Sequence, residues 1–515
     1  MENKTEASLD SCEFVQRYAG QIAGQLGCWD RLIVTGTLLD VGYSGALEKR
    51  LWQDGIRCFD LKLFAEPLRE AMRDHAIKLA RAAGLEVEFI QRKNFRKEDR
   101  ITEIVARRGT APGLVHVFSA MEPCTTFQPW HDKKSGRTGL KPTSGKCLHF
   151  YFYFIHERWG LCYLRVPTWL PFRLQFYCNG HAWLARELTR AGIDWAMADN
   201  AFVRVGDWGK AQQLSDGFEL QQWHRDLDAL AREHVPFLDR FKSGYQWSLM
   251  QVEYSWDVVW KKAEDLAPVY GEISRQAILT VQAADVARFL GKRLSAETEV
   301  TSDFGTRIAG TRIKHRLGPA SVKMHDKRGK VLRIEVTAND VTCFRHYRKV
   351  VGRDGQSQYK VAALKKTIYS LGDLKELMQA ACWRYLAFIS ALEDRSGGAV
   401  NLERITAPVK DPRERSWRGF NFFDRADAQA LLAILRGEHQ ISGLSNRWLQ
   451  RVLPDRSGGQ IGRLLKRLRL HGLIKKVGHT YKYYVTVLGQ KALVAALKIK
   501  EHVILPALAA VPAPA

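Results

Sequence analysis

The sequence has no closely spaced pair of cysteines. Nine cysteines are scattered over 515 residues without a Cys-x-x-Cys spacing, which argues against a zinc ribbon or a redox dithiol. No run of about 18 apolar residues is uninterrupted, so we expect no membrane span and no membrane partner. The polar residues 1–10 lack the apolar core of a signal peptide. These absences predict a cytoplasmic protein with reduced thiols.

Several common catalytic signatures are also missing. The chain has no Ser-His-Asp nucleophile elbow, no HExxH and no Gly-rich nucleotide fingerprint. Gly145-Lys146 is not a P-loop, because it lacks the glycine five residues earlier and the following Ser or Thr. Three histidines near two cysteines lack zinc-ligand spacing: His149, His156 and His181, with Cys147 and Cys178. We therefore expect no resident metal or cofactor from these motifs.

Positive charge is abundant and unevenly distributed. The chain has 79 Lys and Arg against 55 Asp and Glu, a net charge of +24, and its 46% hydrophobic content is that of a globular protein. Residues 441–500 hold 13 Lys and Arg and one acid, Asp455, which is half of the surplus. A basic surface can serve solubility or meet acidic lipid, but clustering of this kind favours a nucleic acid partner, with DNA favoured over RNA.

The pattern of apolar runs predicts an α/β plus α+β protein with several domains. Short apolar runs alternate with amphipathic helices at first, an aromatic hairpin follows, and a Gly- and Pro-containing stretch precedes the basic C-terminal region. The expected segments are a mixed α/β domain at 12–235, an α+β domain at 240–395, a linker at 396–420 and a winged helix-turn-helix at 421–500.

The C-terminal segment carries signals for three short helices and a hairpin. Asp424, Ser445 and Ser457 are candidate N-caps, and Ser457 with Gln460 forms a capping-box pattern. In the third helix the apolar residues recur at i, i+3, i+4 and i+7, which predicts one buried face: Ile461, Leu464, Leu465 and Leu468. Two strands then follow around residues 478–480.

The stretch GGQIGRLLKRLRLHGLIKKVGHTYKYYVTVLGQKAL resembles MarR-type and related winged-helix regulators, over about 75 of the 515 residues. The resemblance implies DNA binding by the third helix and the wing, through Arg463, Lys466, Arg467, Lys475, Lys476, His479 and Lys482, with Gln460 on the outer side of the helix. Some winged helices are instead protein-interaction or dimerisation modules. Such regulators are usually short chains, whereas some 400 residues precede this one.

Two further regions suggest contacts with nucleic acid. A Gly-rich basic loop between the expected strands contains Lys133, Lys134, Arg137 and Lys141, and can either wrap a phosphate backbone or remain a solvated loop. Aromatic residues from Tyr151 to Tyr177, Trp169 among them, surround Arg165 and Arg173. They can form a base-stacking platform or a core.

An enzyme is the main alternative to a binding protein. Metal-dependent nucleases and transposases need carboxylates that converge at strand ends to hold Mg²⁺. Asp30 precedes the first expected strand, Glu122 ends the strand from Gly113, and Asp199 lies in a loop, so these three are the candidate catalytic acids. A component of a ribonucleoprotein is the third possibility. The sequence leaves catalysis and oligomeric state open.

The hairpin expected at 321–337 is faintly similar to a strand pair in phage and plasmid replication initiators. That likeness implies that Lys323, Lys327 and Arg333 approach DNA. The His-x-His metal pair of those initiators is absent. Glu335 is expected to form an ion pair with Arg333.

Overall fold

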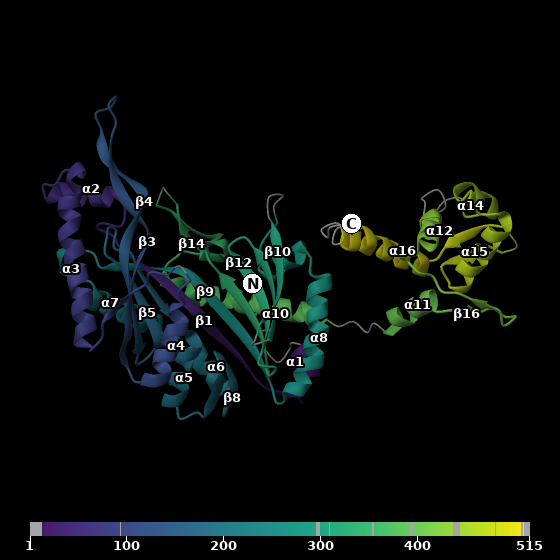
Figure 1. The fold of residues 1–515 in the computed structure, drawn as a ribbon, viewed down its shortest axis with the longest axis horizontal. Helices are drawn as coiled ribbons and strands as arrows, with labels where there is room; N and C mark the ends of the chain where they lie inside the picture. Colours follow the sequence, from purple (N-terminus) through teal and green to yellow (C-terminus); the bar gives the residue numbers. More distant parts are fainter. Residues whose placement is uncertain are drawn as a thin grey trace. The chain divides into compact units, whose positions relative to one another are not determined.

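The computed structural model divides into two compact units, residues 1–391 and 392–515. It describes residues 13–92, 94–294, 299–307, 310–352, 355–391, 396–435, 443–478, 480–505 and 508. Figure 1 shows both units and labels many of their elements. The fold is mixed α/β, as expected, and its main feature is one large mixed sheet.

The first unit is built on an eleven-stranded sheet. Neighbouring strands in the sheet are antiparallel except for the parallel pair β2–β3. The order across the sheet is β10 (Val300–Arg307), β11 (Gly310–Leu317), β12 (Ala320–Lys327), β13 (Val331–Ala338), β9 (Tyr245–Trp260), β1 (Ile22–Leu38), β6 (Leu174–Cys178), β5 (Gly160–Pro167), β4 (Thr138–His156), β3 (Gly113–His131) and β2 (Val87–Phe89).

Strands from the two expected N-terminal segments join this single sheet. β9 pairs along its length with β1 on one side and with β13 on the other, so the segments 12–235 and 240–395 share one hydrophobic core. The expected hairpin around residues 326–329 is confirmed: β12 and β13 pair, and Arg328 and Gly329 both have positive φ, of 56° and 67°. The Lys330 N–H donates to the Lys327 carbonyl, and positive φ at both central residues is the geometry of a type I′ turn.

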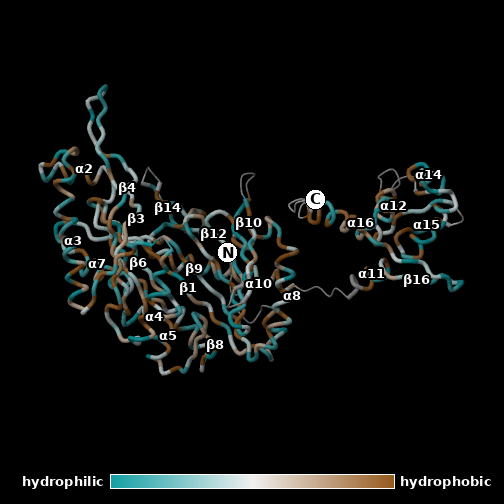
Figure 2. Tube along the Cα trace, viewed as in Figure 1, coloured by the Kyte–Doolittle hydropathy of each residue, from teal (hydrophilic) through white to brown (hydrophobic). Residues whose placement is uncertain are grey.

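A long hairpin, β3–β4, extends from the sheet and ends in a hydrophilic tip (Figures 1 and 2). The sequence predicts a basic loop over residues 131–146, but strand pairing continues to His131 and Thr138. Only the tip is a turn, closed by backbone and hydroxyl hydrogen bonds to Asp132. The loop prediction is therefore wrong for residues 138–146, which pair with β3 instead of remaining free.

Helices pack on both faces of the sheet. On one face α10 packs on β9 and β13, and Trp383 makes an edge contact with Trp256. On the other face His181 of α5 reaches Ser255, because alternate strand residues point to opposite faces. The helices are α1 (Glu13–Arg17), α2 (Ser44–Gln53), α3 (Leu61–Ala82), α4 (Lys97–Arg108), α5 (Gly180–Arg190), α6 (Trp208–Asp216), α7 (Leu220–His234), α8 (Ala263–Thr280), α9 (Ala283–Phe289) and α10 (Leu371–Ser390).

Smaller elements complete the first unit. Two hairpins lie outside the large sheet, β7 (Trp195–Ala198) with β8 (Ala201–Val205), and β14 (Arg345–Val351) with β15 (Ser357–Ala363). Four short 3-10 turns are η2 (Cys58–Asp60), η3 (Leu238–Arg240), η4 (Val341–Cys343) and η5 (Ile368–Ser370).

The second unit has its own hydrophobic core, to which the predicted apolar face of α15 contributes Ile461, Leu464, Leu465 and Leu468. The three N-caps are confirmed, and Ser457 and Gln460 form the predicted capping box. The expected linker at 396–420 contains a helix and a short hairpin. The elements are α11 (Ser396–Thr406), β16 (Val409–Lys410), β17 (Ser416–Trp417), α12 (Arg425–Leu435), α14 (Asn446–Val452), α15 (Gly458–Leu470), β18 (Ile474–Lys476), β19 (Tyr483–Val485), α16 (Val487–Ile499) and the π-helical turn η6 (Lys500–Ile504).

Candidate functional site

A patch of charged side chains lies in the middle of the large sheet, on the face covered by α5. On β9, Glu253, Ser255 and Asp257 alternate with the apolar residues that face α10. The neighbouring strand β13 adds Arg333 and Glu335 by the same alternation. These five polar residues lie on one face in the middle of the sheet, and not at a solvated edge.

Asp30 belongs to this patch. It does not precede the first strand, as the sequence suggests, but lies inside β1 at a bulge between Trp29 and Arg31. Such a bulge can re-aim a strand side chain. Asp30 is 6% exposed and accepts hydrogen bonds from the side-chain amides of Asn179 at 3.2 Å and Asn200 at 2.7 Å. His181 Nδ1 lies 3.3 Å from its carboxylate.

Arg333 neutralises part of the buried negative charge. Its Nε and Nη2 donate to the two carboxylate oxygens of Asp257, each at 2.7 Å, and its Nη1 lies 3.5 Å from Asp30. The expected pair of Arg333 with Glu335 is therefore wrong, because Asp257 lies directly opposite Arg333 in the register. Burial acts to raise the pKa of Asp30, but Arg333 and His181 outweigh it and hold that pKa well below its ordinary value.

Three carboxylates from three adjacent strands converge beside this pair. Asp30, Glu253 and Glu335 each offer an oxygen within 4.8 Å of the others, and the described residues contain one such group of possible metal ligands. Lys323 of β12 forms an ion pair with Glu335 and lies 3.6 Å from Glu253. Burial and the charge of Glu335 raise the pKa of Glu253 to about 7, although Lys323 and Arg31 oppose the rise.

The arrangement suits a hard divalent cation. Carboxylate oxygens at this spacing are the ligands that Mg²⁺ and Mn²⁺ prefer. The raised pKa of Glu253 reflects first its burial and then the charge of Glu335, and either a proton or a bound cation would stabilise the carboxyl there.

The two other predicted acids do not join Asp30. Glu122 lies within β3 rather than at its end, and it accepts hydrogen bonds from Tyr151 at 2.7 Å and Arg165 at 2.9 Å. Asp199 lies in the β7–β8 turn as expected, where both oxygens accept from Arg328 at 3.0 Å. Each of these two carboxylates is thus paired with a nearby cationic side chain, and the structure does not bring Asp30, Glu122 and Asp199 together.

The sequence offers a weak signal for the acids that were missed. Glu253-x-Ser-x-Asp257 and Arg333-x-Glu335 place polar residues at period two within apolar strands, a pattern typical of a polar face inside a sheet. That β9 pairs with β1, and β13 with β9, becomes visible only in the sheet order.

The predicted nucleic-acid contacts of the second unit divide into exposed and internal residues. The exposed group is Gln460, Arg463, Lys475, Lys476 and Lys482. Lys466 forms an ion pair with Asp411 at 2.6 Å. His479 lies outside the described residues.

Arg467 is a structural residue, contrary to the expectation that it contacts nucleic acid. It is 9% exposed, and its guanidinium donates to both oxygens of Asp427 and to the carbonyls of Arg418 and Gly419. Its donors are used inside the unit, so none is directed to a ligand.

The predicted basic residues of the first unit lie on the β3–β4 arm. Lys133, Lys134 and Arg137 occupy the exposed tip, and Lys141 is exposed on β4 nearby. By contrast, most members of the expected aromatic platform are core residues, since Tyr151, Phe152 and Phe176 are 7%, 1% and 0% exposed. Trp169 remains partly exposed.

No protein-family model, curated protein or solved structure matches this chain. None of the described helices combines the length and apolar character that crossing a membrane requires.

Proposed function

We propose that the protein binds nucleic acid, with duplex DNA as the favoured partner, through a winged helix in its second unit. The observation that carries this proposal is the exposed basic surface of α15 and the β18–β19 hairpin, in a segment with 13 Lys and Arg against one acid over residues 441–500. A helix and wing of this charge match the groove and backbone of DNA.

The geometry of the second unit supports the winged-helix interpretation. Three helices, α12, α14 and α15, precede the hairpin, and Leu444 forms a β-bridge with Tyr483 that adds a short third strand. The apolar face of α15 is buried while Arg463 points outward. The helix therefore has a free polar side, as a recognition helix requires.

Binding of a labelled duplex, measured by fluorescence anisotropy over a range of salt concentrations, tests the proposal. We expect Lys475→Ala/Lys476→Ala to weaken binding and to lower the salt slope by about two, since each lost phosphate contact removes about 0.9. Adding Arg463→Ala to this double variant should weaken duplex binding further. The matched control is Lys491→Ala/Lys498→Ala, which removes two exposed cations from α16. Equal losses in both double variants would contradict the proposal, and preference for structured RNA would favour the ribonucleoprotein alternative.

A second candidate function is metal-dependent cleavage of a phosphodiester, with the winged helix as the targeting module. The convergence of Asp30, Glu253 and Glu335 favours it. Mg²⁺ held there would neutralise charge that develops on the phosphate. Lys323 would have to leave its position between the two glutamates, and Asn179 and Asn200 would keep Asp30 oriented.

Metal binding and cleavage are tested separately. Isothermal calorimetry with Mn²⁺ should show binding to the full chain that is lost in Asp30→Asn and Glu253→Gln. Cleavage of labelled single and double strands should require Mg²⁺ or Mn²⁺ and be lost in the same variants. Glu122→Gln is the control, because Glu122 is bound by Tyr151 and Arg165 away from the three acids. Absence of metal binding in the wild-type chain would exclude this candidate.

A further inference from the structure

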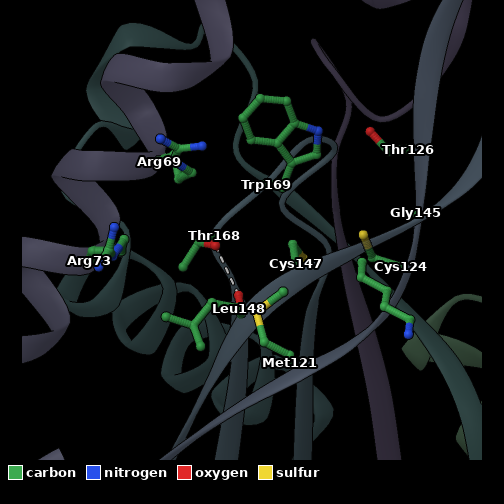
Figure 3. Close-up of a pocket in the computed structure, with 11 residues that line it drawn as sticks. Arg69, Arg73, Met121, Cys124, Thr126, Gly145, Cys147, Leu148, Thr168 and Trp169 are labelled. Atoms are coloured by element: carbon green, nitrogen blue, oxygen red, sulfur yellow. Dashed lines mark hydrogen bonds between the residues drawn. The ribbon is translucent and has the colours of Figure 1, made fainter. Parts of the chain in front are cut away.

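A cavity of about 610 Å³ lies between α3 and the β3–β4 hairpin, away from the acidic patch. Figure 3 shows Arg69 and Arg73 one turn apart on α3, on the side that faces Thr168 and Trp169. The opposite wall comes from β3 and β4 and includes Thr126 and Lys146. Three cations and one indole thus line a single cavity.

A second cavity, of about 290 Å³, adjoins the first, and Trp169 and Cys124 line both. Arg165 and Arg173 line this second space. Trp169 therefore lies between two cavities, each of which is lined by cationic side chains. No carboxylate is found among the described residues that line either cavity.

The nearest acids compete only weakly for the cations of the first cavity. Glu70 lies 2.8 Å from Arg69 and 3.4 Å from Arg73, but all three side chains are 39–49% exposed. Exposed pairs of this kind contribute little net stability, so an anion of higher charge can replace the carboxylate. In the second cavity Arg165 is shared with Glu122 at 2.9 Å.

A polar atom without a partner points independently to a ligand. Thr126 lines the first cavity and is 8% exposed, and its hydroxyl has no hydrogen-bond partner in the described structure. Buried hydroxyls are normally hydrogen-bonded. A ligand with a polar edge or a phosphate oxygen would satisfy it.

We infer that these adjoining cavities bind a nucleotide unit of a single-stranded nucleic acid. The base stacks on the indole of Trp169, one phosphate lies among Arg69, Arg73 and Lys146, and the next lies toward Arg165 and Arg173. Aromatic stacking combined with a cationic groove is how proteins hold single strands without sequence preference. Arg69 lies 5.8 Å from the centroid of the Trp169 ring, so the cation and the stacking surface already adjoin.

This inference rests on the proposed function for the identity of its ligand as nucleic acid, and it places a second surface on the first unit. The probe is a short fluorescein-labelled oligothymidylate, bound to the full chain and followed by anisotropy. We expect Arg69→Ala/Arg73→Ala to weaken binding at least about ten-fold and to lower the salt slope by about 0.7, because both arginines hold the same phosphate. Trp169→Ala should weaken binding about five-fold or more, as loss of one stacked base does.

Lys78→Ala/Arg81→Ala is the matched control, because it removes two cations of the same helix outside both cavities. Thermal melting of each variant checks its folding, and Trp169→Phe, which keeps an aromatic ring, should restore most of the binding. Equal weakening in the control, or wild-type binding by the Arg69/Arg73 and Trp169 variants, would overturn the inference.

Two further measurements separate the sources of the ligand and the two binding surfaces. Competition by a free nucleoside monophosphate at comparable affinity would assign the site to free nucleotides, whereas competition by oligonucleotides alone would assign it to a strand. Both outcomes support binding of a nucleotide at this site.

The two surfaces are separated by testing each double variant with both probes. Lys475→Ala/Lys476→Ala should keep oligothymidylate binding and weaken duplex binding. Arg69→Ala/Arg73→Ala should keep duplex binding and weaken oligothymidylate binding. Failure of one surface is thus distinguishable from failure of the other.

Discussion

At the scale of single residues, the buried charged side chains in the described part of the chain are held by partners. Arg333 is 0% exposed and is held by Asp257, and Arg467 is held by Asp427. An unpaired buried charge costs several kcal/mol, so each of these pairs must be kept intact. Sequence reasoning treats a Lys- or Arg-rich helix face as a surface, and for that reason it misassigns Arg467.

Removal of Arg467 should destabilise the second unit strongly. We expect Arg467→Ala to lower the free energy of unfolding by about 2–3 kcal/mol, because the buried carboxylate of Asp427 loses both bonds from Arg467 and keeps only those from Arg418 and the Asn421 backbone. Hydrogen exchange of the α15 amides under increasing urea measures the change. Arg463→Ala, an exposed neighbour on the same helix, should change it by less than about 0.5 kcal/mol. Similar small effects in both variants would show that Arg467 is not a structural residue.

His315 should make folding sensitive to acid. It is 1% exposed between Ser302 and Tyr385, and burial lowers its pKa from 6.5 to about 4. The neutral ring is favoured in the folded state, so its contribution is fully present above pH 6.5 and is lost as the pH falls toward 4. The loss is on the order of 3 kcal/mol. Urea unfolding measures the free energy of unfolding of wild type and His315→Gln across this pH range. We expect this free energy to fall less steeply with decreasing pH in the variant, and equal slopes would contradict the prediction.

At the scale of elements, the β3–β4 hairpin is the clearest departure from expectation. The sequence predicts a strand from Gly113 that ends at Glu122 and a basic loop over residues 131–146, whereas pairing continues to His131 and Thr138. Gly, Pro and Lys disfavour strands locally. The ladder nevertheless continues, and α2 supports it where Glu48 accepts from the backbone of Leu140. Tertiary support thus outweighs local propensity.

The tip of this arm should contribute to nucleic-acid affinity without contributing to folding. We expect Lys133→Ala/Lys134→Ala/Arg137→Ala to lower affinity for oligothymidylate or duplex and to reduce the salt slope, while the melting temperature stays unchanged because all three residues are exposed. Anisotropy and thermal melting on the same samples measure both. Unchanged affinity with either probe would assign the tip to the solvated-loop alternative.

At the scale of the whole molecule, the chain divides into two units with separate cores. The acidic patch and the Trp169 cavities lie within residues 1–391, and the basic helix and hairpin lie within residues 392–515. Each unit buries its own apolar cluster. Each kind of site therefore lies within a single unit.

Residues 392–515 expressed alone should fold. A cluster that includes Ile434, Leu449 and Leu468 closes within this segment, so we expect a cooperative thermal transition and retained duplex binding. Circular dichroism and anisotropy measure these. A non-cooperative melt would show that the second unit depends on the first.

Local signals predicted the second unit well because its helices are defined by neighbours in sequence. The N-caps, the capping box and the apolar face of α15 all depend on spacings of three or four residues. The candidate acidic site could be predicted only in part. Asp30 was identified, but Glu253 and Glu335 lie more than 200 residues away, on strands whose order across the sheet no local pattern encodes.

The sequence by itself determined the class of secondary structure, the net charge and its concentration near the C-terminus, and the helix ends of the second unit, because composition and short-range spacing are local properties. Only the tertiary structure decided which acids meet, which arginines are internal, and that Arg69 and Trp169 share a cavity. These are contacts between distant segments, and the order and register of the strands and the packing of helices on the sheet determine them.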